Sequence, residues 1–242
     1  MRGVVLPHFK TKRADKMYKY ETHMHTREAS ACAWSSGAEM AEKYKAEGYT
    51  GIIVTDHFFN GNSAVPRDLP WKERIELYCK GYENAKARGD QIGLDVFFGF
   101  EYGDGGSDFL VYGLDKQWLI KNDHILDIGL TNFLEYARSC GGIIVHAHPF
   151  RDYEYIRSTT HAPHFIDAVE GVNASHTKAG HSEFNDRAKL YAQWYGLPIT
   201  GGSDSHNTAD KWYGGGVLSE RKFTSATDYA KAVVNREVIC IE

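Results

Sequence analysis

The segment MYKYETHMHT, residues 17–26, opens with a strand candidate and leads directly into two histidines, His23 and His25. Residues i and i+2 of an extended chain point to the same side, so these two imidazoles should project together. The same arrangement recurs in GIIVTDH, residues 51–57, and in GIIVHAH, residues 142–148, where a β-branched apolar run ends in histidine. The same pattern, a buried strand with ionisable side chains at its carboxyl end, therefore occurs at three places in the sequence.

Further strand and helix candidates extend this pattern along the chain. Strands that alternate with helices predict parallel pairing with the helices packed outside, and about seven strands in ~220 residues suit a closed or nearly closed α/β barrel better than an open sheet. We expect the barrel domain to cover residues 17–242, with residues 1–16 as an N-terminal extension. The other strand candidates are residues 94–101, 109–114, 167–173, 197–206, 215–219 and 237–242, and the helix candidates are residues 37–47, 71–88, 131–139, 182–195 and 224–234.

The composition of the 242-residue chain argues against several classes of protein. With 28 Lys and Arg against 32 Asp and Glu, the net charge is −4 and no basic run occurs, which disfavours general nucleic-acid or membrane-surface binding. The four cysteines form no C-x-x-C pair, and the N-terminus lacks the features of a signal peptide. No apolar stretch is long enough to suggest a membrane span. We therefore expect a cytoplasmic protein with reduced thiols.

Ionisable side chains gather at the predicted carboxyl ends of the strands. In α/β barrels this rim carries catalysis, because the loops after the strands converge around one mouth. So many donors need either mutual hydrogen bonds or cations. Imidazoles and carboxylates suit zinc, manganese or iron rather than calcium, and they are numerous enough for two or three ions. The residues are His23, His25, Asp56, His57, Glu101, Asp108, His146, His148, Asp204 and His206.

Five ordered motifs at these strand ends resemble the PHP (polymerase and histidinol phosphatase) superfamily of metal-dependent phosphoesterases. They cover nearly all of the chain from residue 20 onward. The resemblance implies a distorted seven-stranded (β/α)7 TIM-like barrel that binds two or three divalent metal ions (Zn, Mn or Fe). The motifs are ETHMHT (21–26), VTDH (54–57), GFE (99–101), AHPF (147–150) and GSDSH (202–206).

Carried over motif by motif, the resemblance implies three metal sites, with Glu101 shared by two of them. The first would be formed by His23, His25, Glu101 and Asp204, the second by Glu101 and His148, and the third by His57 and His206.

The sequence departs from the superfamily pattern at two positions. Asp108 stands where many members have a histidine, and its carboxylate can still bind a metal. After the H-x-H turn, where members often place His or Asp, this chain offers Ala31 and Cys32. Cys32 could supply a thiolate ligand, or the third site could be weak or empty.

The resemblance also implies a mechanism, hydrolysis of a phosphate ester by a metal-activated water. Asp204 or His206 would shuttle protons. Arg151 and Arg27, each close behind a histidine motif, are candidates to hold phosphate oxygens, although a surface salt bridge is an equal alternative for Arg151.

Two further residues are predicted to support the ligands from behind. Asp56 would orient an imidazole, although it could itself be a ligand. His146 shares a face with His148 if the strand alternates regularly, so it could also point toward the mouth.

Three functions fit these observations. The leading hypothesis is a phosphoesterase acting on a small phosphate ester, either histidinol-phosphatase-like or specific for a nucleotide or sugar phosphate. An amidohydrolase-type enzyme that cleaves C–N bonds is the first alternative, since such barrels also open with H-x-H; they usually lack T-D-H and a histidine after the last aspartate. A metal-binding PHP module without catalysis is the second. The expected partner is a small phosphorylated substrate, and the sequence favours no particular oligomer.

Overall fold

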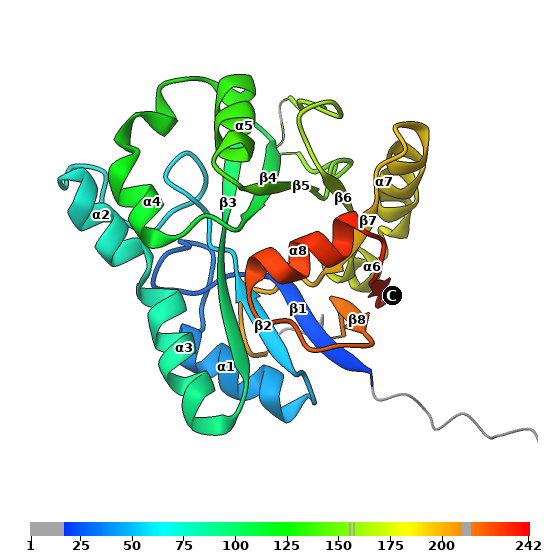
Figure 1. Ribbon diagram of the computed structural model, residues 1–242, viewed down its shortest axis with the longest axis horizontal. Coiled ribbons are helices and arrows are strands. Elements are labelled where there is room, and N and C mark those ends of the chain that lie inside the picture. Colours follow the sequence, from blue (N-terminus) through cyan, green and yellow to red (C-terminus); the bar gives the residue numbers. More distant parts are fainter. Residues whose placement is uncertain (1–16, 155, 157, 210–213) are drawn as a thin grey trace, which may run out of the picture.

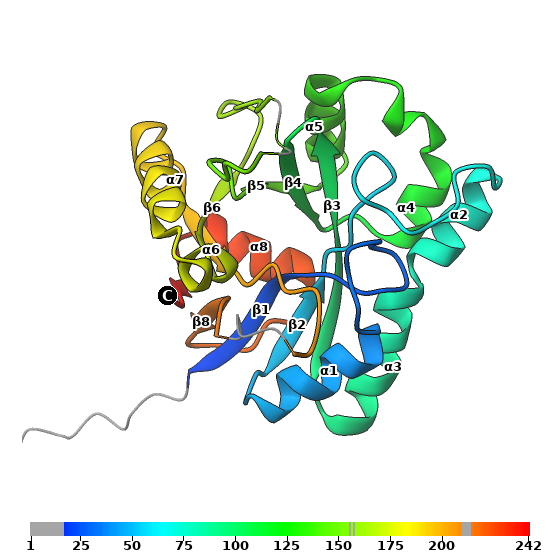
Figure 2. The ribbon, with the colours of Figure 1, turned by 180° about the vertical axis from the view of Figure 1, so that it is seen from behind.

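The computed structural model describes residues 17–154, 156, 158–209 and 214–242. The N-terminal extension expected at residues 1–16 lies outside them. One curved sheet occupies the centre, and most helices lie on its outer side in both ribbon views (Figure 1, Figure 2). Within the described part of the chain, no helix is long and apolar enough to cross a membrane.

The sheet contains nine strands among the described residues, in the order β7-β6-β5-β4-β3-β2-β1-β8-β9. Its parallel strands are buried on both faces, as all of β2 is, which explains their continuous apolar runs. The strand bounds are β1 Tyr18–Met24, β2 Gly51–Val54, β3 Asp95–Asp104, β4 Ser107–Tyr112, β5 Ile143–Ala147, β6 Ala168–Asn173, β7 Ile199–Gly202, β8 Val217–Ser219 and β9 Ile239–Cys240.

The sheet closes at the end where the ionisable residues lie. Met24, at the end of β1, pairs in parallel with Ser205, just after β7. The backbone amide of Asp204 donates to the carbonyl of His23 at 2.8 Å. At the opposite end β8 pairs antiparallel with β1 and takes the place of β7 as its neighbour. Closure therefore brings the ends of the first and seventh strands together at the rim.

The expected (β/α)7 barrel is wrong in its details, because not all strands are parallel. β4 runs antiparallel to both β3 and β5. Only Gly105 and Gly106 separate β3 from β4, and so short a connection can join only antiparallel strands. β8 and β9 are further antiparallel additions. The fold is therefore α/β, with a nearly closed barrel-shaped sheet of nine strands in the described residues.

The helices begin and end at clear sequence signals. Ser36 caps α1, and with Glu39 it forms a reciprocal capping box. The single helix expected over residues 71–88 is divided at Cys79 into α2 and α3. The helix bounds are α1 Gly37–Ala46, α2 Trp71–Tyr78, α3 Lys80–Ile92, α4 Lys116–Lys121, α5 Leu130–Ser139, α6 Ala174–Ala179, α7 Ser182–Trp194 and α8 Ala226–Val234, with a 3-10 helix at Asp123–Leu126.

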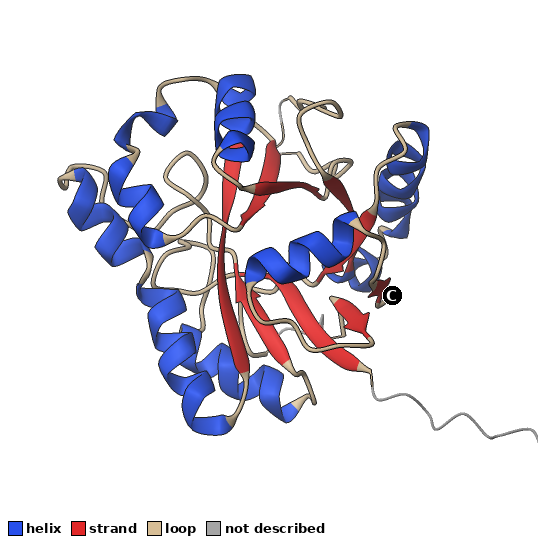
Figure 3. Ribbon diagram, viewed as in Figure 1, coloured by secondary structure: helices blue, strands red, loops and turns tan. Residues whose placement is uncertain are grey.

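Helix α8 lies across the concave side of the sheet, between β3 and β7 (Figure 3). Its Tyr229 packs edge-on against Tyr112 of β4, with ring centroids 5.1 Å apart, and both rings are fully buried. Burying a large apolar side chain contributes about 1.5–3 kcal/mol, so this cluster fixes the strands against each other away from the ionisable rim.

Candidate metal centre

Eight ionisable side chains from the ends of six strands converge at the rim. They form four overlapping groups, and within each group the donor atoms lie within 4.8 Å of one another. The structure thus brings together every predicted ligand except Cys32, which lies beside the cluster; the ligand roles themselves stay predictions. The groups are His25–His57–His206, His23–His25–Glu101, His23–His148–Asp204 and Glu101–Asp108–His148.

Glu101 lies at the centre of the cluster. Its Oε1 is 3.2 Å from Nε2 of both His23 and His148. Its Oε2 forms an ion pair with Nδ1 of His57 at 2.5 Å, but within the described part of the chain no hydrogen bond of regular geometry reaches this buried oxygen. A buried carboxylate that is left unsatisfied among imidazoles is costly unless a cation binds it. Its position suits a ligand shared between two metal ions.

The two histidines of the H-x-H motif place their Nε2 atoms side by side among carboxylates. Nδ1 of His23 faces the carboxylate of Glu170 at 2.8 Å, so this nitrogen carries the hydrogen. Nδ1 of His25 donates to Ser30, whose own hydroxyl donates to Asp56. In the neutral rings both Nε2 atoms are therefore acceptors. They face each other at 3.2 Å, and they also face carboxylate oxygens of Glu101 at 3.2 Å and Asp204 at 3.1 Å. Two facing acceptors fit a cation between or beside them.

The pKa shifts show how the cluster behaves without metal. Burial lowers the pKa of His23, but the charges of Glu170, Asp204 and Glu101 more than offset this and hold it well above its ordinary value. Burial and the nearby His57 and His206 hold the pKa of His25 well below the ordinary value. A proton on His23 therefore supplies some of the positive charge that a metal would provide.

The backbone is strained at two of these positions. His148 and Asp204 have backbone φ angles of 28° and 55°, which residues other than glycine rarely adopt. Such strain typically costs about 1–3 kcal/mol and is found at functional sites. At His148 it follows directly after β5, where it breaks the alternation of the strand and turns the imidazole toward Glu101.

Two buried carboxylates behind the cluster support it. Asp56 accepts hydrogen bonds from the backbone and hydroxyl of Thr26 and from Ser30, which connects it to His25 as the sequence predicted for a supporting residue. Sequence reasoning missed Glu170, which accepts from His23 and from the backbone amide of His148. The signal was an acidic residue inside the apolar strand AVEGVN.

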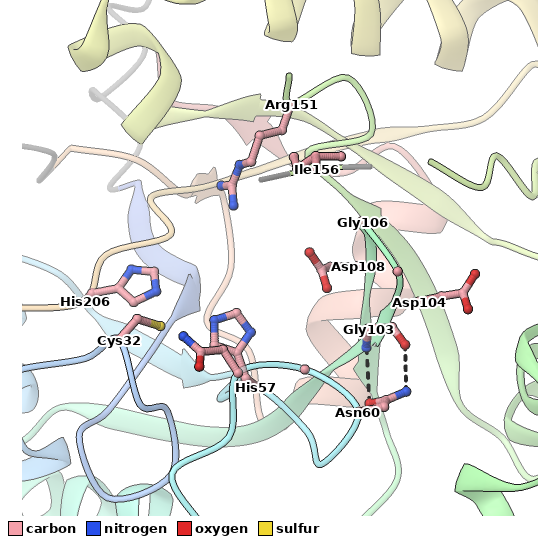
Figure 4. A pocket seen from close by; sticks show the side chains of 13 residues that line it. Cys32, His57, Asn60, Gly103, Asp104, Gly106, Asp108, Arg151, Ile156 and His206 are labelled. Atoms are coloured by element: carbon pink, nitrogen blue, oxygen red, sulfur yellow. Dashed lines mark hydrogen bonds between the residues drawn. The ribbon is translucent and has the colours of Figure 1, made fainter. Parts of the chain in front are cut away.

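Cys32 lies beside His57 and His206, and all three line a cavity at the rim (Figure 4). Burial raises the pKa of its thiol, but hydrogen bonds from these two imidazoles outweigh burial and lower the pKa to about 6. The backbone places Cys32 there, because Ala31 pairs with Asn62 and Trp34 pairs with His206, each at 2.8 Å. The thiol therefore lies beside two members of the group His25–His57–His206.

The two predicted phosphate-binding arginines differ in position. Arg151 points into the cavity, where it forms an ion pair with Asp204 and donates from Nε to Nε2 of His176 at 3.1 Å (Figure 4). His176 thus orients Arg151. Arg27 instead pairs with Glu39 on the outer surface, with its side chain 54% exposed. The structure does not bring Arg27 to the cluster.

His146 also lies away from the cluster, on the outer side of the sheet. Its ring stacks on Phe109 at 4.7 Å and lies near Tyr191 of α7, and both ring nitrogens lack hydrogen-bond partners. The expected shared face with His148 is wrong because His148 follows the end of β5, where the backbone has left the extended conformation. His146 has no contact that would orient a ligand.

The comparison with family models found a match to one part of the chain. A family model described as PHP-associated (PHP_C) matches residues 182–210, which contain α7, β7 and the Asp204–His206 pair. No curated protein matches the sequence.

Three solved structures share the fold at low sequence identity. A two-domain protein from Bacteroides vulgatus containing a predicted PHP-like metal-dependent phosphoesterase is 15% identical, with a TM-score of 0.68 over 93% of this chain. This chain spans 64% of that protein's length. A candidate metal-dependent phosphoesterase from Bifidobacterium adolescentis is 15% identical, with a TM-score of 0.53 over 92% of this chain and 97% of its own. An amidohydrolase from Chromobacterium violaceum, with bound sulfate and no metal, is 13% identical, with a TM-score of 0.53 over 92% and 98%.

The fold and the rim define the class of protein, an α/β protein with a nearly closed barrel-shaped sheet and a cluster of side chains at its mouth that could hold metal ions. The five motifs are thus joined by a PHP-associated match over residues 182–210 and by a fold shared with structures described as PHP-like or metal-dependent phosphoesterases.

Proposed function

We propose that this protein is a metal-dependent phosphoesterase that hydrolyses a small phosphate ester and binds two or three divalent ions (Zn, Mn or Fe). The observation that carries the proposal is the buried carboxylate of Glu101, which is shared by two groups of potential ligands and has an oxygen without a hydrogen bond. When bound, the metal ions would lower the pKa of water toward neutrality and polarise the phosphoryl oxygens.

The chain's own residues supply the other requirements of the reaction. Arg151 presents a planar guanidinium at the mouth, which suits two oxygens of a phosphate group. His206 lines the cavity, and the contact of its Nδ1 with the backbone carbonyl of Asp204 at 2.9 Å holds the ring in place. An imidazole at this position can exchange a proton with a ligand in the cavity. Asp204 would help to orient this imidazole and to balance its charge.

The direct test is an ester-hydrolysis assay on metal-free protein reloaded with zinc, manganese or iron. We expect release of phosphate or alcohol from at least one phosphate ester, and none after chelation. The fold likeness to an amidohydrolase is the reason to include amide and deamination substrates in the same panel. Hydrolysis of those substrates alone would favour the C–N alternative, and stoichiometric metal without any hydrolysis would favour the non-catalytic module.

Metal affinity is expected to fall as the pH drops through about 6. Burial and the charge of Glu101 raise the pKa of Asp108 to about 6. Below that pH the carboxyl holds a proton that a metal must displace, so affinity should fall about tenfold per pH unit for this group. Competition titrations of zinc at several pH values measure it. An Asp108→Asn variant should show a shallower dependence, and equal slopes would exclude Asp108 as a ligand.

Cobalt bound to this protein is expected to show thiolate-to-metal charge-transfer absorption in the near ultraviolet. The thiol of Cys32 is largely ionised near neutral pH, and it stands beside two imidazoles of the group His25–His57–His206. Cys32→Ser should lose the band and weaken one metal site, while a variant at the exposed Cys140 should keep both. A band that survives in Cys32→Ser, or is missing from the parent protein, would show that the thiolate is not a ligand.

A further inference from the structure

Two cavities flank the metal centre and meet at the same three residues. The first has a volume of about 550 Å³ and the second about 330 Å³, and both are lined by Cys32, Arg151 and His206. A phosphate held by Arg151 would therefore have open space in two cavities. A monoester needs space for one alcohol group only.

The first cavity has walls of polar side chains and bare backbone. Gly61, Gly103 and Gly106 form part of its surface, which lets a ligand approach the main chain closely. Asp104 adds a half-buried carboxylate, while Asn60 is held by hydrogen bonds to Gly103 (Figure 4). This lining suits a small polar group that carries hydroxyls.

The second cavity is different, because an exposed indole stands at its edge. Trp34 is 79% exposed and lines this cavity together with Tyr153 and Ser175. Its backbone is fixed to the site by a hydrogen bond from its amide to the carbonyl of His206 at 2.8 Å. An aromatic side chain left in water beside a phosphate site is a suitable surface for stacking a flat ring.

We propose that the substrate is a phosphodiester, with one ester group that carries a flat aromatic ring against Trp34 and a small polar ester group in the first cavity. This proposal rests on the proposed function. In the reaction, water oxygen bonds to phosphorus and one of the two P–O ester bonds breaks. The departing alkoxide takes a proton, one alcohol and one phosphate monoester are formed, and no electron is transferred.

The experiment compares four chromogenic esters with the metal-loaded protein. They are 4-nitrophenyl phosphate, bis(4-nitrophenyl) phosphate, methyl 4-nitrophenyl phosphate and thymidine 5′-(4-nitrophenyl phosphate). We expect kcat/KM to be higher for the diesters than for the monoester. We also expect the thymidine diester to exceed the methyl diester by about tenfold, the gain that one stacked base typically gives.

Trp34→Ala should remove that tenfold preference, because the thymine base loses the indole against which it stacks. Trp194→Ala is the matched control, because Trp194 is equally exposed at 77% but does not line either cavity. A preference for the monoester, or a Trp34→Ala variant that keeps the parent's preference, would overturn the proposal.

The outcomes also separate this proposal from the proposed function. Hydrolysis of the monoester alone would leave the phosphoesterase intact and refute the diester. If no ester is hydrolysed, the phosphoesterase fails, and calorimetric binding of the diester thymidylyl-thymidine still tests the cavities. Binding that weakens in Trp34→Ala but not in Trp194→Ala would support the diester site, and the absence of binding would refute it.

Discussion

Replacing Glu101 by glutamine is expected to weaken metal binding more than about a hundredfold and to abolish ester hydrolysis. The charges of His57 and His23 overcome burial and hold the pKa of Glu101 well below its ordinary value, so the native side chain is ionised. Glutamine keeps the shape but removes the charge, and its amide would face imidazole nitrogens 3.2 Å away. Replacing a residue that orients a metal ligand typically lowers metal affinity 10- to 100-fold, and replacing a ligand shared by two ions should lower it more.

Asp104→Asn is the matched control for Glu101→Gln. Asp104 lines the same cavity and accepts a hydrogen bond from Thr160, but it belongs to none of the four ligand groups. A substitution of this kind usually changes free energies by less than about 0.5 kcal/mol, so metal affinity should stay within about twofold. Metal counted by mass spectrometry and affinity measured by competition decide the matter. Equal metal content in Glu101→Gln and the parent would contradict the central position of this carboxylate.

The positions of most site residues could be predicted because apolar runs and ionisable residues occur together in the sequence. Apolar β-branched runs such as GIIVTDH mark buried strands, and the ionisable residues stand at their ends. A barrel then brings the ends of parallel strands to one rim, however distant they are along the chain. This reasoning placed His23, His57 and Glu101 in one cluster, as the structure does.

Other features depend on geometry that the patterns do not carry. The turn at Gly105–Gly106 makes β4 antiparallel, whereas the alternation of strands and helices predicts a parallel strand there. The i, i+2 rule failed for His146 because it assumes that the strand continues to His148, where φ is 28°. Arg27 follows its motif closely, yet the loop turns its side chain to Glu39. Each error comes from a local departure from regular backbone.

Glu170 shows the remaining gap most clearly, since a single acidic residue within an apolar strand does not reveal its partners. Its Oε1 accepts from His23, and its Oε2 accepts from the backbone amide of His148 and from Asn173. Burial raises the pKa of Glu170, but the charge of His23 and these contacts lower it overall, so the group is ionised. All three partners donate hydrogen bonds to Glu170, so the position requires a side chain with two acceptor oxygens.

Glu170→Gln is therefore expected to lower metal affinity about 10- to 100-fold, because either orientation of the amide places N–H groups against donors and releases the His23 ring. Hydrogen bonds to a charged group contribute about 1.5–3 kcal/mol each, so the metal-free protein should also unfold at lower temperature.

Glu21→Gln separates a general loss of stability from the effect on the metal. Glu21 is equally buried, but burial raises its pKa, so a neutral side chain is closer to its native state. One of its oxygens accepts three backbone amides, and the other meets the hydroxyl of Tyr44, which can accept from an amide instead. Glutamine fits this pattern, and metal affinity should change little. If both variants bind metal equally well, the carboxylate of Glu170 does not orient His23 for a metal, and the cluster would depend on the ligands alone.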